Sequence, residues 1–145
     1  MGDLRMPRGV YEAVRAHGEE RYPEECCGVL LGRKVAGGWR VEAAVRAGNA
    51  ERARGGYRIA MEELIGAERE ARGRGLEIAG FYHSHPDCVA EWSRRDLEEA
   101  HWPGCAYMIT AVVEGRARES RGFVLCGRGE DEKRFEELEI EVIEE

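Results

Sequence analysis

The sequence predicts an α/β or α+β fold in which helices flank one mixed sheet. Three observations predict it. Apolar runs of strand length recur along the chain, two segments have helical spacing, and glycines mark the boundaries between them. Because strands and helices alternate rather than forming separate blocks, we expect a layered sandwich of sheet and helices.

The first third of the chain predicts a helix followed by a hairpin. Pro7 to His17 has apolar residues at helical spacing, and Gly18 follows as a stop signal. The apolar run Cys27 to Leu31 and the alternating run Trp39 to Val45 are separated by a Gly37-Gly38 turn. We therefore expect these two runs to pair as antiparallel strands.

The middle of the chain predicts a covering helix and a buried strand. Tyr57 to Ile59 can extend the sheet. Met61 to Arg72 has a helical period, which runs through Met61, Leu64, Ile65, Glu68 and Ala71. Leu76 to Tyr82 is an apolar run, which we expect to be a buried strand. Ser93 then opens a further helix as its N-cap.

The last third predicts three more strands. Ala106 to Val113 and Arg121 to Leu125 lie on either side of Gly115, which indicates a turn between them. In Phe135 to Val142 apolar residues alternate with glutamates, which is typical of a half-buried strand. We expect the glutamates to form the solvated face of a strand at the sheet edge.

Length and charge indicate one domain that spans residues 1–145. A chain of 145 residues with 43% hydrophobic content is sized for a single core. The formal net charge is -7, and the arginines are interspersed with acidic residues. Nucleic acid is therefore not an expected partner, because phosphate binding requires a clustered positive field.

Membrane and disulfide signals are missing from the sequence. The chain has no apolar run long enough to span a bilayer, and its N-terminus has no apolar core of a secretory signal. The five cysteines form an odd set without paired metal-ligand spacing, so we expect reduced thiols. These features predict a cytoplasmic protein that does not span a membrane.

The segment from Gly80 to Asp96 has the residue types and spacing of a metal site. His83 and His85 are two positions apart, so both imidazoles can lie on the same side of an extended strand. Asp96 can supply a third ligand and leave a fourth tetrahedral position open, as in catalytic zinc sites. Imidazole and carboxylate ligands favour zinc, with iron or manganese as competitors.

A purely structural interpretation of these residues is the alternative. His83 and His85 would then flank the turn at Pro86-Asp87. Ser93 would be an ordinary N-cap, and Asp96 would complement the helix dipole. A pair of histidines alone is weak evidence, because short motifs often match by chance. The presence of Ser93 and Asp96 at these spacings favours the metal site.

A zinc hydrolase also needs a base that accepts a proton from the attacking water. Two adjacent carboxylates, Glu24 and Glu25, precede the apolar run that starts at Cys27. Adjacent side chains of an extended segment point to opposite faces, and either face can meet the metal. Both glutamates are therefore candidates, and a solvated surface charge is the alternative for each.

The string His83-Ser-His-Pro, followed by Ser93 and Asp96, resembles the JAMM signature of the JAB1/MPN/Mov34 metalloprotease family. The stretch around Glu25 is similar to the family segment that carries the catalytic glutamate, which implies Glu25 rather than Glu24 as the base. The resemblance covers nearly the whole chain and looks most like the compact bacterial branch. It implies the MPN/JAB1 domain fold, a curved mixed sheet flanked by helices that is cytidine-deaminase-like.

The resemblance also implies a mechanism. Zinc held by His83, His85 and Asp96 would activate water, and Glu25 would move the proton from that water to the leaving amine. A carboxylate that acts first as base and then as acid needs a raised pKa, which a partly apolar environment can produce. Ser93 would donate a hydrogen bond to the developing oxyanion.

Members of this family cut bonds at the C-termini of ubiquitin-like proteins. The resemblance therefore implies a peptidase or isopeptidase that acts after the C-terminal Gly-Gly tail of a ubiquitin-like or sulfur-carrier protein. Three leaving groups stay open, namely cysteine, a peptide and a lysine side chain.

Three other functions compete with this hypothesis. A non-catalytic MPN scaffold would only bind a partner protein, but such relatives lack the metal ligands that are present here. A zinc deaminase would need H-x-E and P-C-x-x-C motifs, which this chain does not have. A general small-peptide metallopeptidase would share the zinc chemistry and differ in its substrates.

Overall fold

The computed structural model of the protein describes residues 3–51 and 56–144. Within these residues the chain forms seven strands and four helices. In chain order they are β1 (Asp3–Pro7), α1 (Arg8–Arg21), β2 (Cys27–Val35), β3 (Gly38–Ala47), α2 (Met61–Gly73), β4 (Glu77–Pro86), α3 (Arg94–Glu99), β5 (Ala106–Val113), β6 (Arg116–Cys126), α4 (Gly129–Glu132) and β7 (Arg134–Ile143).

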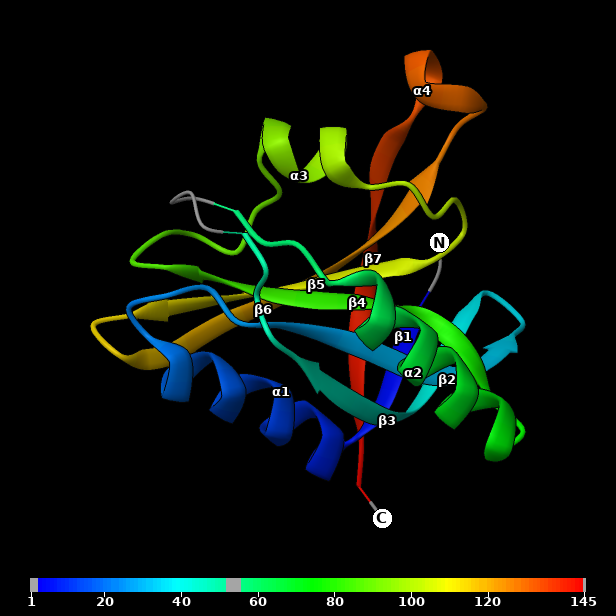
Figure 1. The fold of residues 1–145 in the computed structure, drawn as a ribbon, viewed down its shortest axis with the longest axis horizontal. Coiled ribbons are helices and arrows are strands. Elements are labelled where there is room, and N and C mark those ends of the chain that lie inside the picture. The colour runs from blue at the N-terminus through cyan, green and yellow to red at the C-terminus, as the bar shows by residue number, and fades with distance from the viewer. Residues whose placement is uncertain (1–2, 52–55, 145) are drawn as a thin grey trace.

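The strands form one mixed sheet that closes into a barrel in the order β1-β3-β2-β4-β5-β6-β7 (Figure 1). β1 pairs in parallel with both β3 and β7, and β4 pairs in parallel with β5. The remaining neighbours are antiparallel, including the β2–β3 hairpin that the Gly37-Gly38 turn predicts. The predicted mixed sheet is confirmed, and its closure was not predicted.

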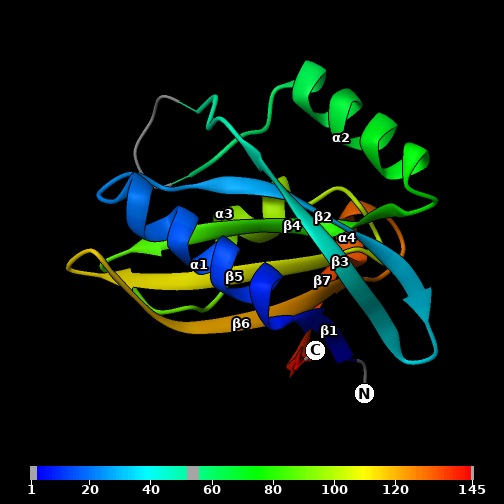
Figure 2. The ribbon, with the colours of Figure 1, turned by 90° about the horizontal axis from the view of Figure 1, so that it is seen from below.

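Two hydrophobic clusters lie on opposite faces of the sheet because successive strand residues point to opposite sides. In β2, Leu30 belongs to the cluster that contains Val14 of α1. Its neighbours Val29 and Leu31 belong to the cluster that contains Ala67 of α2. Figure 2 shows α1 lying across the strands and α2 beyond β2 and β3. The two helices therefore cover different faces.

The predicted face of α2 is confirmed in part, because Ala71 is buried and Leu64 packs against the same cluster, whereas Met61 and Ile65 do not. Ala67 and Ala71 are buried against the sheet, whereas Met61 is 66% exposed and Ile65 is 44% exposed. The small alanines allow the helix to approach the sheet closely, and the larger side chains at positions 61 and 65 remain on its solvated side.

Helix α1 runs past the predicted stop at Gly18 and ends at Arg21. Gly18 is buried, and a Cβ atom on it would lie 3.0 Å from Cγ2 of Val112 in β5. A glycine inside a helix can serve close packing as well as termination. Here it lets α1 contact the sheet.

The C-terminal strand is not at a sheet edge, so that expectation was wrong. β7 pairs with β6 on one side and with β1 on the other. β1 is a short segment without a clear alternating pattern, and it was not predicted. Tyr57 to Ile59 does not form a strand, and only an isolated bridge between Asn49 and Ile59 is present there.

The cysteines and the helices bear on two expectations from the composition, namely reduced thiols and the lack of a membrane span. All five cysteines are free thiols, as the odd number and irregular spacing predict. Among residues 3–51 and 56–144, the helices are too short or too polar to cross a bilayer.

Candidate metal and catalytic site

Two structural elements bring the three predicted metal ligands together. His83 and His85 lie near the end of β4, and Asp96 lies in the first turn of α3. A loop connects the end of β4 at Pro86 to the start of α3 at Arg94. It brings the ligands on the strand and the ligand on the helix together. All three side chains are largely shielded from solvent, with exposed fractions of 2%, 12% and 10% in chain order.

The side chains of His83, His85 and Asp96 converge closely enough to hold a metal ion, because one ligand atom from each lies within 4.8 Å of the others. Nε2 of His83 lies 3.2 Å from Nε2 of His85 and 3.2 Å from Oδ1 of Asp96. Nε2 of His85 lies 3.1 Å from Oδ2 of Asp96. Zinc bonds of about 2.0 to 2.1 Å in tetrahedral geometry place ligand atoms about 3.3 Å apart. This His-His-Asp group, hereafter the metal cluster, could therefore hold one metal ion.

The orientation of each imidazole has its own cause. Nδ1 of His85 lies 2.9 Å from the carbonyl oxygen of Val89, which can only accept, so Nδ1 carries a proton and Nε2 is the ring nitrogen that faces Asp96. The ring of Tyr57 stacks on His83 with centroids 4.4 Å apart and an interplanar angle of 22°. Nδ1 of His83 is buried without a partner among the described residues. Packing against Tyr57 and the contact of Nε2 with Asp96 therefore orient His83.

Charge in the metal cluster favours a cation. Burial acts to raise the pKa of Asp96, but hydrogen bonds from His83 and His85 outweigh burial and hold this pKa well below its ordinary value. Burial acts to lower the pKa of His85, yet the hydrogen bonds to Asp96 and to the Val89 carbonyl raise it. The carboxylate is thus negative, and it stabilises positive charge beside it.

Ser93 is the N-cap of α3, as the sequence predicts. Its hydroxyl accepts a hydrogen bond from the backbone N–H of Asp96 over 3.1 Å. Its own N–H donates to Oδ2 of Asp96 over 2.9 Å, which completes a capping box. A serine hydroxyl that accepts one hydrogen bond keeps its proton as a donor. The cap therefore orients Asp96 and is compatible with a second role for the Ser93 hydroxyl.

Glu25 and Glu24 have different surroundings. Glu24 is exposed and pairs with Arg21 at 3.1 Å. Glu25 is half-buried and lies two residues before the start of β2, where Cys27 pairs with His83. Burial raises the pKa of Glu25, and the nearby charges of His83 and His85 oppose that rise. The structure therefore brings Glu25, and not Glu24, to the metal cluster.

A comparison with protein families gives the identity of the fold. The family described as prokaryotic homologues of the JAB domain matches residues 7–138. The chain belongs to the prokaryotic JAB family. This membership confirms the JAMM resemblance and the JAB/MPN fold expected from the sequence.

Curated relatives of this JAB protein include two enzymes. The desampylase of Haloferax volcanii is 39% identical over 88 residues, which cover 60% of this chain and 62% of the relative. The chain thus spans less than two thirds of that relative. The CysO-cysteine peptidase of Mycobacterium tuberculosis is 31% identical over 111 residues, which cover 77% of this chain and 75% of the relative.

Solved structures resemble the JAB protein over nearly its whole length. A protein from Desulfitobacterium hafniense has a TM-score of 0.83 and 25% identity, covering 98% of this chain and 94% of that one. A JAB1/MPN domain protein from Archaeoglobus fulgidus has a TM-score of 0.56 and 16% identity, covering 99% and 97%. The second comparison supports the fold alone.

Several residues around the metal cluster were not predicted as part of the site. Ser84, between the two histidines, accepts a hydrogen bond from the N–H of Cys26 over 2.8 Å, next to Glu25. Tyr57 packs on His83, and Asn49 donates a hydrogen bond to the carbonyl of Glu25. These contacts join segments that are far apart in sequence. In the sequence, the stretches 47–50 and 57–59 also resemble the compact bacterial branch of the family, and this resemblance is the signal for Asn49 and Tyr57.

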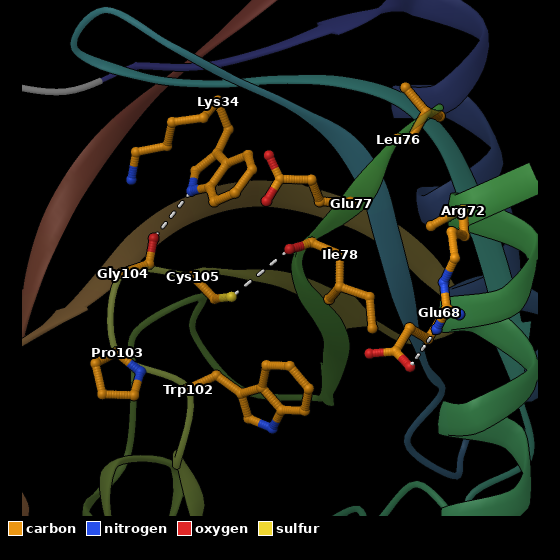
Figure 3. A pocket seen from close by; sticks show the side chains of 12 residues that line it. Lys34, Glu68, Arg72, Leu76, Glu77, Ile78, Trp102, Pro103, Gly104 and Cys105 are labelled. Carbon is orange, nitrogen blue, oxygen red and sulfur yellow. Dashed lines mark hydrogen bonds and ion pairs between the residues drawn. The ribbon is translucent and has the colours of Figure 1, made fainter. Parts of the chain in front are cut away.

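A cavity of about 670 Å³ lies at the other end of β4 (Figure 3). It is bounded by α2, the start of β4 and the loop before β5, and residues of the metal cluster do not line it. Trp39 donates from its indole N–H to the carbonyl of Gly104 over 2.9 Å, and the Cys105 thiol faces the carbonyl of Ile78 at 3.8 Å. The cavity is therefore separate from the candidate chemistry.

Proposed function

We propose that His83, His85 and Asp96 bind one zinc ion in a catalytic site. The observation that carries this proposal is the convergence of these side chains, since one ligand atom from each lies within 4.8 Å of the others. The two imidazole nitrogens are 3.2 Å apart, and each lies 3.1 or 3.2 Å from one of the two carboxylate oxygens of Asp96. Two imidazoles and one carboxylate leave a fourth tetrahedral position for water or substrate. This donor set also binds iron or manganese, but zinc suits it best.

Hydrolysis of an amide bond is the proposed reaction. When bound, zinc supplies Lewis-acid chemistry, which makes water a competent nucleophile near neutral pH. The Glu25 carboxylate accepts a proton from the attacking water and then delivers it to the nitrogen of the leaving amine. The raised pKa of Glu25, which burial causes, suits a group that must act as base and then as acid.

Ser93 is proposed to stabilise the negative charge that develops on the scissile carbonyl oxygen. Its hydroxyl proton remains available because the hydroxyl oxygen is the acceptor in the helix cap. The capping box holds Ser93 beside Asp96, so the donor is oriented before the reaction begins. A donor fixed in advance stabilises the transition state without reorganisation.

The proposed substrate is a ubiquitin-like or sulfur-carrier protein with a C-terminal Gly-Gly tail. The bond cleaved follows the tail, and the leaving group is cysteine, a peptide or a lysine side chain. Support comes from membership in the prokaryotic JAB family and from two relatives that are named a desampylase and a CysO-cysteine peptidase. The reducing cytoplasm is the proposed compartment, which suits the five free thiols.

The alternative function is a non-catalytic scaffold. A scaffold needs neither metal ligands nor a half-buried carboxylate with a raised pKa near them, whereas this chain has both. We further propose that residues 1–145 form one catalytic domain. One closed sheet supports this, because its strands begin at Asp3 and end at Ile143.

One experiment tests the proposed function directly. A ubiquitin-like sulfur carrier with one extra C-terminal cysteine is incubated with the zinc-loaded protein, and its intact mass is measured. We expect the wild type to release cysteine and Glu25→Gln to do so at least about 100-fold more slowly. If the zinc-loaded wild type leaves this adduct and matched peptide and isopeptide conjugates uncut, the scaffold function is supported instead.

A further inference from the structure

Asn49, just after the end of β3, uses its whole side-chain amide in hydrogen bonds. Oδ1 accepts from the backbone N–H of Glu51 over 2.9 Å and from that of Arg58 over 3.0 Å. Nδ2 donates to the carbonyl of Gly56 over 3.1 Å and to that of Glu25 over 3.4 Å. The two backbone donors and two backbone carbonyls allow only this orientation of the amide.

Of these four hydrogen bonds, the one to Glu25 connects Asn49 to a segment that is distant in sequence. Three bonds, to the backbone of Glu51, Gly56 and Arg58, fix the plane of the amide, so its remaining N–H is aimed at the Glu25 carbonyl. Glu25 lies outside β2, whose ladder to β4 begins at the Cys27–His83 pair. Asn49 therefore holds the residue proposed as the base at a point where the sheet does not.

A second set of contacts anchors the other side of the same peptide. The N–H of Cys26 donates to the Ser84 hydroxyl over 2.8 Å, and the N–H of Ser84 donates to the carbonyl of Cys26 over 3.2 Å. The backbone that follows Glu25 is thus held by β4 through Ser84 and by the loop through Asn49. A residue held from two sides has fewer orientations available to its side chain.

The segment that carries Asn49 also contacts the metal cluster. Tyr57 stacks on His83, and Glu51 forms an ion pair with Arg95, which precedes Asp96. Gly56 lies so close to Arg95 that a Cβ atom on it would be 2.3 Å from the guanidinium carbon. Residues near Asn49 thus contact His83, a proposed ligand on β4, and Arg95, which lies in α3 next to the proposed ligand Asp96.

We propose that Asn49 is a positioning residue that sets the distance between Glu25 and the metal cluster. It does not touch substrate or metal, and it acts through the backbone of Glu25. This inference rests on the proposed function, in which Glu25 moves the proton. Displacement of a reacting group by about 1 Å can cost about 100-fold in rate, so a single amide can matter for turnover.

Two substitutions separate this role from general loosening of the loop. Asn49→Asp keeps both acceptor bonds, to Glu51 and Arg58, but loses both donated bonds. Arg58→Ala removes an exposed side chain that donates to the carbonyl of Ala50 and leaves all four Asn49 contacts in place. We expect Asn49→Asp to lower kcat by about 10-fold to 100-fold with little change in KM, and Arg58→Ala to change kcat less than about twofold. An equal loss in both variants would overturn the proposal.

Coupling to Glu25 gives the second test. In a Glu25→Gln background, Asn49→Asp should cause no further loss of the residual rate, because the two residues act on one step. The same fold-loss in both backgrounds would show that Asn49 acts elsewhere, and the proposal would be wrong. Zinc content should stay at one ion per chain in Asn49→Asp, and loss of zinc would likewise overturn it. Asn49→Ser replaces Asn49→Asp if the latter unfolds.

Amide hydrogen exchange tests the contact without any substrate. Asn49→Asp should speed exchange in residues 22–28 and leave residues 83–86 of β4 unchanged. Unchanged exchange in residues 22–28 would overturn the positioning role, whatever the activity. If the wild type cleaves no carrier conjugate while Asn49→Asp does alter this exchange, the proposed function fails and the structural coupling stands.

Discussion

His85 donates the proton on its Nδ1 atom to the backbone carbonyl of Val89 across 2.9 Å, and this bond fixes which ring nitrogen faces Asp96. Because a carbonyl only accepts, Nδ1 carries a proton and Nε2 is left as the ring nitrogen directed into the metal cluster. The Val89 side chain is 61% exposed and takes no part in this bond. The fold therefore prepares a metal ligand through backbone geometry.

Removal of a ligand should abolish metal binding without unfolding the protein. We expect His85→Ala to weaken zinc binding by more than about 100-fold, which is the upper range for loss of an outer partner of a ligand. Competition with a chromophoric chelator measures the affinity, and the thermal midpoint of the apoprotein checks the fold. Glu25→Gln should bind zinc as the wild type does. Zinc loss in Glu25→Gln would mean that Glu25 is a ligand and not a base.

Three substitutions at Ser93 should separate its cap from its hydroxyl proton. Ser93→Ala removes both and should cost about 1 kcal/mol of stability and about 100-fold to 1000-fold in kcat. Ser93→Thr keeps both and should retain most activity. Ser93→Asp keeps a capping acceptor but has no hydroxyl donor, so its stability should be near that of the wild type while kcat falls.

Urea unfolding and steady-state kinetics on one carrier conjugate measure the two effects of the Ser93 series. The oxyanion role requires that kcat follows the hydroxyl and that stability follows the cap. If kcat across the three variants instead follows their stability, Ser93 is only a helix cap, which is the structural alternative that the sequence leaves open.

Local sequence patterns predict most of the fold. The β2–β3 hairpin, helix α2 and strand β5 each have a strong period and clear turn signals, and they lie close to their expected positions. β1 was not predicted because its position depends on pairing with β3 and β7, which are distant in sequence. The closure of the barrel therefore depends on long-range strand pairing, which a short stretch of sequence cannot predict.

The candidate site also has residues that a local pattern predicts and residues whose position depends on long-range contacts. His83, His85, Ser93 and Asp96 lie on one strand, loop and helix start, so their spacing alone indicates a common location. The contact between Asn49 and Glu25 could not be predicted, because it joins the segment after β3 to the segment before β2. Tertiary structure decides which of two adjacent glutamates meets the cluster.

Two glycine substitutions should change stability in opposite directions. A Cβ atom on Gly28 in β2 would lie 2.3 Å from the ring of Tyr82, which is fully buried. Gly28→Ala should therefore destabilise the protein by about 1 to 3 kcal/mol, because the core cannot expand. Gly66 is exposed within α2 and has open space around it, so Gly66→Ala should stabilise by about 0.5 to 1 kcal/mol. Urea unfolding of both variants checks the signs, and equal effects would contradict the packing.

His17 should make stability depend on pH. It is 4% exposed in α1, and its Nδ1 lies 2.8 Å from the hydroxyl of Tyr82. Burial lowers the pKa of His17, and the charges of Arg46 and Arg21 lower it further, while Glu20 opposes them. The folded state therefore favours the neutral imidazole of His17, and it binds the imidazole proton less tightly than the unfolded chain does. This contribution is fully present above the unfolded pKa of about 6.5, and it is lost as the pH falls toward the lower folded pKa.

His17→Gln tests this sign because the amide can still bond to Tyr82 but does not titrate. Unfolding free energies measured at pH 8 and pH 5 should fall more steeply for the wild type than for His17→Gln. Other groups titrate equally in both proteins, so the difference between the two slopes isolates His17. Identical slopes would mean that His17 has the same proton affinity in the folded and unfolded states. The burial of His17 beside Tyr82 would then not make the free energy of unfolding depend on pH.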